Sequence, residues 1–272
     1  MDSLTRDGVK LVYEEKGRGE PPLVFVHGWT CDHTYFAPQV GYFSRDHRTI
    51  AVDLRGHGES DKPEQPYTME GFADDVAWLC EQLGVTKPVV IGHSLGGTVA
   101  LALATGHPAV PAALVAIDAP WYAPQNIRDL VPGLTEAFKG PQSRETQRQV
   151  VRDAFFLPSD DQQRRDRIAD HMSSAPRHVM LSAWEHVWDF DSDGALAGLS
   201  VPALYIGGGA PLGPDGTGAA LGTLEAIRAQ NAQIVIGQTV GAGHFCQLDA
   251  ADQVNAMIAR FLATTLPVPK PR

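Results

Sequence analysis

A serine flanked by glycines is the feature of this sequence that most constrains its fold. Ser94 lies at the centre of Gly92-His93-Ser94-Leu95-Gly96, directly after the apolar run Pro88–Ile91 and directly before the helix-like run Gly97–Ala104. A strand, a sharp turn and a helix in this order hold the serine in a strained backbone conformation at the strand tip. Glycines two positions before and after the serine remove side chains that would clash across the turn. The pattern predicts a nucleophilic serine; the simpler alternative is a glycine-rich turn with a helix-capping serine.

Short apolar segments that alternate with helical patterns extend this arrangement along the chain. Strands are predicted at Val9–Tyr13, Leu23–Val26, Ile50–Leu54, Pro88–Ile91, Ala113–Asp118, Ala203–Gly207 and Gln233–Ile236. Helices are predicted at Thr68–Leu83 and Asp252–Leu262. This alternation is typical of an α/β protein with a doubly wound, mostly parallel sheet. Right-handed crossovers then place the carboxyl ends of the strands at one edge, where functional sites form.

Residues 121–198 interrupt the alternation. This segment is rich in Arg, Asp, Gln and aromatic residues, it lacks a convincing buried strand, and Gln142–Ala154, Asp160–Ser173 and Arg177–Val187 have helical patterns. We expect a helical cap inserted into a core made of residues 1–120 and 199–266. The proline-rich residues 267–272 are expected to form a frayed tail.

The composition limits the classes of function. The 43% hydrophobic and 20% charged residues are those of an ordinary globular protein, and the net charge of −10 disfavours nucleic acid as a partner. No apolar run approaches membrane-spanning length, and the first residues lack the apolar core of a signal peptide. Cys31, Cys80 and Cys246 are widely spaced and show no metal-ligand spacing, which favours reduced thiols in the cytoplasm and no metal site.

A serine nucleophile needs a base within hydrogen-bond reach. Of the ten histidines, His244 is the strongest candidate, because it lies among small residues in a loop after the last predicted strand. The loop His27-Gly28-Trp29 follows a buried strand and can aim a backbone N–H at the nucleophile. Together with the N–H of Leu95, the N–H of Trp29 would form an oxyanion hole.

Four segments in this order resemble the α/β-hydrolase superfamily. They are Val26-His27-Gly28-Trp29, the stretch from Asp53 to Ser60 (DLRGHGES), Gly92-His93-Ser94-Leu95-Gly96-Gly97 and Gly243-His244-Phe245. The resemblance spans nearly the whole chain and implies the order nucleophile, acid, histidine, with no metal or organic cofactor.

The acid is where this sequence departs from the usual pattern of that superfamily. Its members usually carry an aspartate in the loop after the strand equivalent to Ala203–Gly207, but here that loop begins with glycines and its first carboxylate, Asp215, comes late. Some members place the acid at the end of the strand after the nucleophile helix, where Asp118 stands in this chain. Asp118 is therefore the preferred acid, Asp215 the alternative and Asp249 a weaker third.

A serine in place of an elbow aspartate excludes dehalogenase and epoxide-hydrolase chemistry and leaves acyl transfer. Trp121, Tyr122, Trp184 and Trp188 of the cap are candidate substrate-binding residues, although aromatics also pack a cap onto its core. The sequence thus predicts a hydrolase of small to medium apolar esters or lactones. Carbon–carbon bond hydrolysis, cofactor-free perhydrolysis and a non-catalytic ligand receptor remain alternatives, and no oligomeric state is predicted.

Overall fold

The protein is built around a mixed β-sheet. The computed structural model describes residues 1–208 and 219–266, and within them the sheet has eight strands in the order β1-β2-β4-β3-β5-β6-β7-β8. The strands are β1 (Asp2–Arg6), β2 (Val9–Lys16), β3 (Leu23–Val26), β4 (Thr49–Asp53), β5 (Val89–His93), β6 (Ala113–Ile117), β7 (Ala203–Gly207) and β8 (Val235–Gln238). From β4 to β8 all neighbouring strands pair in parallel, whereas β1 and β2 pair antiparallel.

Helices cover both faces of this sheet because its central strands are apolar on both sides. In β3, Val24 and Val26 belong to one buried cluster, and Leu23 and Phe25 belong to another. The first cluster contains side chains of α2 (Met69–Gln82), α3 (Leu95–Gly106), α8 (Ser192–Ala197) and α9 (Ala219–Gln230). The second contains side chains of α1 (Ala37–Phe43), α10 (Cys246–Asp249) and α11 (Ala251–Thr265), and a short 3-10 helix, η1 (His33–Phe36), precedes α1. The predicted doubly wound α/β sheet is confirmed.

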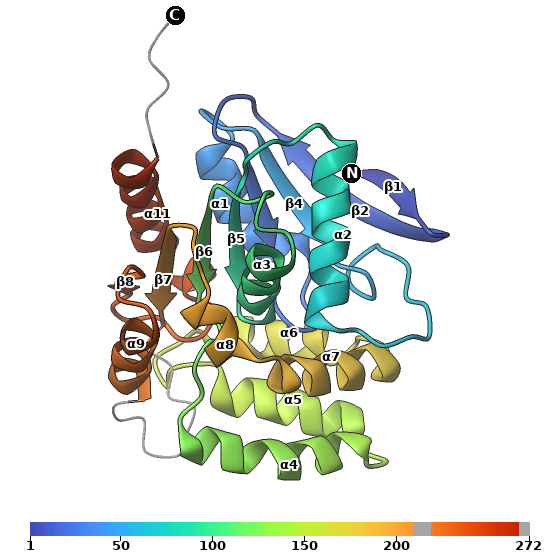
Figure 1. Cartoon of the computed structure of the whole chain (residues 1–272). Helices are drawn as coiled ribbons and strands as arrows, with labels where there is room; N and C mark the ends of the chain where they lie inside the picture. The colour runs from blue at the N-terminus through green and yellow to red at the C-terminus, as the bar shows by residue number, and fades with distance from the viewer. Residues whose placement is uncertain (209–218, 267–272) are drawn as a thin grey trace, which may run out of the picture.

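A layer of helices lies across one edge of the sheet. In Figure 1, α4 (Gln125–Lys139), α5 (Ser143–Ala154), α6 (Gln162–Met172) and α7 (Arg177–Asp189) lie below the sheet, between β6 and β7 in the chain. Below, these four helices are called the cap helices. Three of them match predicted helices, with boundaries that differ by at most two residues.

Among the elements that the sequence interpretation did not predict are α4 and β1. Pro132 lies inside α4, and a proline lacks the N–H that a helix interior needs, so the segment does not look like a helix. β1 has no buried side chain and pairs only with β2, so it lacks the apolar run that marks the central strands. The last strand, predicted at Gln233–Ile236, lies two residues further along as β8.

Several features bear on the environment of the chain. The thiols of Cys31, Cys80 and Cys246 are free and buried, and burial raises the pKa of Cys80 to about 12. Across residues 1–208 and 219–266, no helix is both long and apolar enough to cross a membrane. In the same part of the chain, no cluster of three His, Cys, Asp or Glu side chains is arranged to hold a metal ion.

Candidate active site

Ser94 occupies a strained turn between β5 and α3. Its backbone angles are φ 52° and ψ −124°, a left-handed conformation that L-residues rarely adopt. A Cβ at Gly92 would overlap the carbonyl of Gly96, and a Cβ at Gly96 would overlap the carbonyl of Val26. The two glycines therefore permit the close approach that the turn requires. The turn leaves Ser94 half-buried, on the wall of a cavity.

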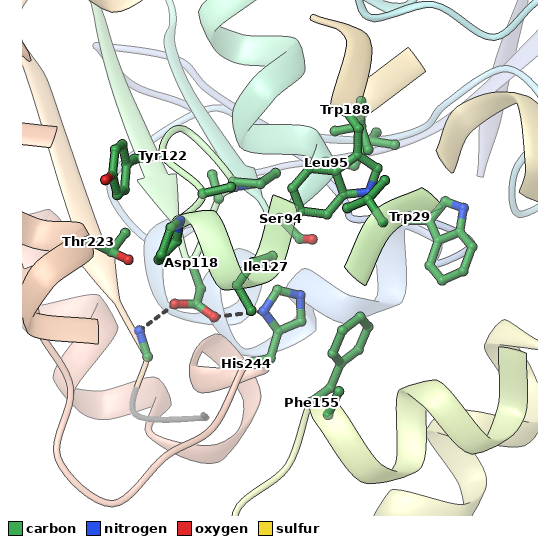
Figure 2. A pocket seen from close by; sticks show the side chains of 18 of the residues that line it. Trp29, Ser94, Leu95, Asp118, Tyr122, Ile127, Phe155, Trp188, Thr223 and His244 are labelled. Carbon is green, nitrogen blue, oxygen red and sulfur yellow. Dashed lines mark hydrogen bonds and ion pairs between the residues drawn. The ribbon is translucent and has the colours of Figure 1, made fainter. Parts of the chain in front are cut away.

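Asp118 and His244 form a hydrogen-bonded pair beside this serine. The Nδ1 atom of His244 lies 2.7 Å from Oδ2 of Asp118, across 126 residues of sequence (Figure 2). Asp118 follows β6 directly and has a positive φ of 45°, which turns the chain sharply after the strand. With Nδ1 donating its proton to Asp118, the Nε2 atom of His244 is the nitrogen that can accept a proton. Ser94, Asp118 and His244 line the same cavity.

The loop after β7 supports the carboxylate of Asp118 with a backbone donor. The N–H of Gly208 donates to Oδ1 of Asp118 at 2.7 Å, so each carboxylate oxygen has a partner. A Cβ at position 208 would overlap the carbonyl oxygen of Gly243 and lie 3.2 Å from Cγ of Asp118. No side chain fits at this position. Gly208 lies in the loop where the sequence pattern led us to expect the acid. Its N–H instead binds Asp118, the candidate acid that follows the neighbouring strand β6.

Of the other two candidate acids, Asp249 does not enter this arrangement. Asp215 lies outside the described residues. Asp249, in α10, pairs through its carboxylate with Arg164 of α6. Burial raises the pKa of Asp249, although Arg164 opposes that shift.

Two backbone N–H groups are available near Ser94 for a developing oxyanion. Leu95 is the first residue of α3, and the N–H groups of a first helical turn have no acceptor within the helix. The N–H of Trp29 has no hydrogen-bond acceptor among the described residues, and both Trp29 and Leu95 line the cavity. The indole N–H of Trp29 donates to the carbonyl of Met180 in α7 at 2.8 Å, which ties this loop to a cap helix.

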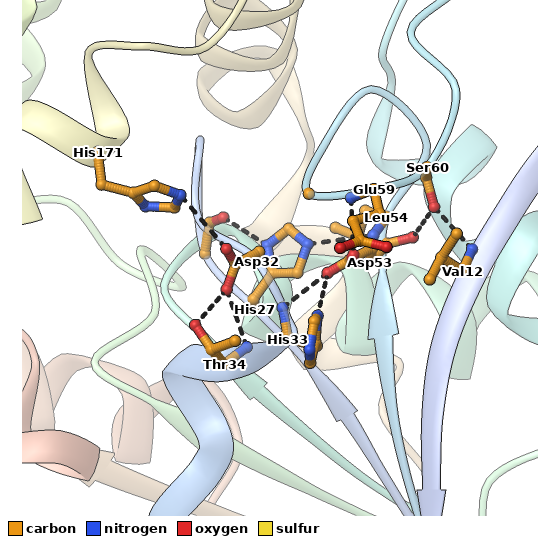
Figure 3. Close-up of polar contacts among 12 residues, drawn as sticks. Val12, His27, Asp32, His33, Thr34, Asp53, Leu54, Glu59, Ser60 and His171 are labelled. Atoms are coloured by element: carbon orange, nitrogen blue, oxygen red, sulfur yellow. Dashed lines mark hydrogen bonds and ion pairs between the residues drawn. The ribbon is translucent and has the colours of Figure 1, made fainter. Parts of the chain in front are cut away.

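A buried polar network holds the loops after β3 and β4 together (Figure 3). The N–H of Leu54 donates to Nε2 of His27 at 3.1 Å, so Nδ1 of His27 carries the proton and donates to the carbonyl of Gly28 at 2.8 Å. Burial lowers the pKa of His27, which keeps the ring neutral as this pattern requires. His27 therefore fixes the peptide that leads into Trp29.

Asp53 fixes the second of these loops. Its carboxylate accepts hydrogen bonds from the backbone N–H groups of His33 and Glu59, each at 2.8 Å, and pairs with the ring of His33. Burial alone would raise the pKa of Asp53, but these hydrogen bonds outweigh it and lower the pKa. Asp53 is fully buried and stays ionised as a structural anchor, away from the cavity lining.

The cavity above Ser94 is mainly apolar and has a volume of about 190 Å³. Between the sheet edge and the cap helices it is lined largely by aliphatic and aromatic side chains, among them Ile127, Leu130, Val131, Leu134, Val150, Phe155, Val187 and Leu224. No lysine or arginine is among the described lining residues. Asp118 is the only carboxylate among them, and it is hydrogen-bonded to His244.

Three of the four predicted cap contacts lie on this cavity, and one does not. Tyr122, Trp184 and Trp188 line it. Trp121 is fully buried, its indole N–H donates to the carbonyl of Gly97 at 3.0 Å, and its ring packs on Tyr205. The predicted contact of Trp121 with substrate is therefore wrong. Trp121 joins the start of the cap to α3, because its ring packs in the core and its one N–H donor has an acceptor there.

Two groups of cavity residues were not singled out from the sequence. The apolar face of α4 has side chains at positions 127, 130, 131 and 134, a helical spacing that was present in the sequence and was obscured by Pro132. Phe155, at the end of α5, contacts the ring of His244 with 4.5 Å between ring centroids. No local sequence signal distinguishes this phenylalanine from a packing residue.

The comparisons with known proteins agree with this architecture. Residues 21–209 match the family model for the alpha/beta hydrolase fold, which is more than half of the chain. The protein belongs to the α/β-hydrolase family. A thermophilic esterase from Thermogutta terrifontis has a similar structure, with a TM-score of 0.82, 26% identity and 97% of each chain covered. The enol-lactonase from Burkholderia xenovorans LB400 shares the fold, with a TM-score of 0.80, 22% identity, and 96% of this chain and 100% of the lactonase covered.

Several curated relatives match over shorter stretches. The 2-(acetamidomethylene)succinate hydrolase of Mesorhizobium japonicum is 41% identical over 110 residues, which are 40% of this chain and 39% of that enzyme. The match thus spans about two fifths of the relative's length. Family membership supports hydrolase activity, and the substrate must be inferred from the site of this chain.

Proposed function

We propose that this hydrolase cleaves uncharged, apolar carboxylic esters, including lactones, with Ser94, His244 and Asp118 as its catalytic triad. The observation that carries the proposal is the 2.7 Å pair of His244 and Asp118 on the cavity that Ser94 also lines. A serine at an elbow, an imidazole with one nitrogen held by a carboxylate, and free N–H donors are what acyl transfer requires.

The reaction follows from these positions. Ser94 Oγ attacks the ester carbonyl while Nε2 of His244 takes the hydroxyl proton, and Asp118 stabilises the imidazolium. The N–H groups of Trp29 and Leu95 would hold the negative oxygen of the tetrahedral intermediate. The intermediate collapses as His244 returns the proton to the leaving alcohol. Water, activated by His244, then hydrolyses the acyl-enzyme and releases the acid; in a lactone, acid and alcohol leave as one molecule.

The lining of the cavity supports an uncharged substrate. A carboxylate on the substrate would lose its hydration on entering and would find no lysine or arginine among the described lining residues. The name of the Mesorhizobium relative specifies a succinate derivative, a substrate with carboxylates. We expect this chain to differ from that enzyme in substrate, because its cavity offers an apolar surface where a dicarboxylate would need cations.

Two further parts of the proposal concern substrate contacts and location. Tyr122, Trp184 and Trp188 would contact the apolar part of a small-molecule substrate, since they line the same cavity as Ser94. Neither nucleic acid nor a membrane is expected as a partner, and no cofactor is needed for these steps. Three free, buried cysteines support a reducing compartment such as the cytoplasm.

A pair of esters with nearly the same shape tests this proposal. The purified chain and Ser94→Ala are assayed with p-nitrophenyl 4-methylpentanoate, which is neutral, and with mono-p-nitrophenyl succinate, in which a carboxylate replaces the terminal branch. We expect kcat/KM at least about tenfold higher for the neutral ester, and no turnover above background in Ser94→Ala. Equal rates would contradict the substrate class. Tight binding without turnover of any ester would instead indicate a ligand receptor.

A further inference from the structure

His244 is held by the cap as well as by the core. Its backbone N–H donates to the carbonyl of Phe155 at 3.0 Å, and Phe155 follows directly after α5. The phenylalanine ring lies against the imidazole, with 4.5 Å between centroids and an angle of 42° between the planes (Figure 2). One cap residue therefore contacts both the backbone and the side chain of the proposed general base.

The core holds the same residue through His93. Nε2 of His93 lies 2.9 Å from the carbonyl of His244, and the two rings are 4.7 Å apart. Because the acceptor is a carbonyl, Nε2 of His93 carries the proton and donates it. Burial lowers the pKa of His93, which keeps this ring neutral. The peptide of His244 thus has its N–H fixed by the cap and its carbonyl fixed by the residue before the nucleophile.

The neighbouring phenylalanine does not share this arrangement. Phe156 is buried and packs on Phe245, with 5.4 Å between ring centroids, and beneath the guanidinium of Arg165. Phe155 is half-buried and lines the cavity. Two adjacent rings at the end of α5 therefore differ in one respect that matters here: Phe155 touches the imidazole of His244, and Phe156 anchors the cap on the residue after it.

We propose that Phe155 is a positioning residue through which the cap sets the orientation of His244. This inference depends on the proposed function, in which His244 moves the proton of Ser94. The Phe155 ring limits rotation of the imidazole about its side-chain bonds and excludes water from that face. Misplacement of a reacting group by about 1 Å can cost a hundredfold in rate. Through Phe155, the position of the cap is coupled to proton transfer as well as to substrate binding.

The test compares three variants of the full chain: Phe155→Ala, Phe155→Leu and Phe156→Leu. Each is assayed for kcat and KM with p-nitrophenyl acetate and p-nitrophenyl butyrate from pH 5 to pH 9, after its folding is checked by circular dichroism. Phe156→Leu is the matched control, because it removes the adjacent ring without removing a contact to His244. The titratable groups that touch the imidazole, Asp118 and His93, are unchanged in all three.

For Phe155→Ala we expect kcat to fall about tenfold or more by the same factor for both esters, with KM changed little. Phe155→Leu should restore much of kcat, and Phe156→Leu should leave kcat close to that of the parent chain. A change in KM alone that grows with acyl length would overturn the inference, as would equal losses of kcat in Phe155→Ala and Phe156→Leu. If the parent chain hydrolyses no ester, the proposed function itself falls.

Discussion

The carboxyl ends of β6 and β7 lie side by side and contribute different things to the site. β6 is followed by Asp118, a carboxylate residue with a positive φ, whereas β7 is followed by Gly208, which contributes a backbone N–H. The donor of one strand and the carboxylate of the other meet at 2.7 Å. The position of an acid along the chain is therefore less restricted than its position relative to the histidine. A strand end that lacks the acid can still be required, because it holds the acid of its neighbour.

The largest expected effect comes from removing the charge at the end of β6. Asp118→Asn should lower kcat for p-nitrophenyl butyrate by about ten-thousandfold, because the amide favours the wrong tautomer of His244. Asp215→Asn should stay within about threefold of the parent chain. Rates measured at pH 7.5 on both folded variants give the ranking. The opposite ranking would move the acid to the segment after β7 and end the contrast between the two strands.

The next effect comes from the end of β7. Gly208→Ala should lower kcat about ten- to a hundredfold, because its Cβ would overlap the carbonyl of Gly243 and press on the Asp118 carboxylate. Overpacking of this kind also costs about 1–3 kcal/mol of folding free energy. Kinetics and urea unfolding measure the two effects. Gly198→Ala is the control, since the nearest atom to a Cβ there is 3.5 Å away. Equal behaviour of the two variants would contradict a supporting role for Gly208.

A pH experiment extends the comparison to strand ends that carry neutral histidines. Burial lowers the pKa of His27 and His93, and lowers that of His57 to about 3. In the unfolded chain the pKa of a histidine is about 6.5. Below this pH the unfolded chain binds protons while these three rings stay neutral in the native state. The free energy of unfolding therefore decreases as the pH falls below about 6.5. His33 has a raised pKa beside Asp53, so its contribution changes only above that range.

The expected size is up to about 1.4 kcal/mol per pH unit for each such histidine. Urea unfolding at pH 7.0, 6.0 and 5.0 measures the trend, and His57→Phe should reduce its slope by removing one titrating ring. A free energy of unfolding that stays constant down to pH 5.0 would show that these rings are protonated in the native state.

The smallest expected effect is a change in substrate preference when a positive charge is added to the cavity lining. Leu130 lines the cavity and is 51% exposed, so a lysine is tolerated at this position on α4. Leu130→Lys should raise kcat/KM for mono-p-nitrophenyl succinate about fivefold relative to p-nitrophenyl 4-methylpentanoate, a gain that added salt reduces. Leu130→Gln serves as the uncharged control. An unchanged ratio would mean that the acyl group of the substrate does not lie along α4.

Much of the fold could be predicted from the sequence because its central strands are buried on both faces. Continuous apolar runs such as Leu23–Val26 and Ala113–Ile117 predict inner parallel strands. Ser94, with a glycine two positions before and after it, predicts the turn after β5. The exposed edge strand β1 gave no such signal. In α4, Pro132 obscured a helical apolar pattern.

The residues of the site also divide into those that the sequence identifies and those that it does not. Ser94 and His244 could be chosen from their loops, but the choice between Asp118 and Asp215 depends on a distance that no spacing reports. The role of Gly208 was hidden because a backbone N–H leaves no trace in residue type. Trp121 was misplaced because an aromatic at the start of a cap can face the core as readily as the cavity.

The most direct test of the central claim is covalent labelling of the nucleophile with a p-nitrophenyl alkylphosphonate, followed by mass spectrometry of the intact chain and of its peptides. We predict one adduct per chain on Ser94 and none in Ser94→Ala. The labelling rate should fall by several powers of ten in Asp118→Asn and stay unchanged in Asp215→Asn. An adduct on another residue, or labelling slowed by Asp215→Asn instead of Asp118→Asn, would contradict the assignment of Ser94, His244 and Asp118 as the triad.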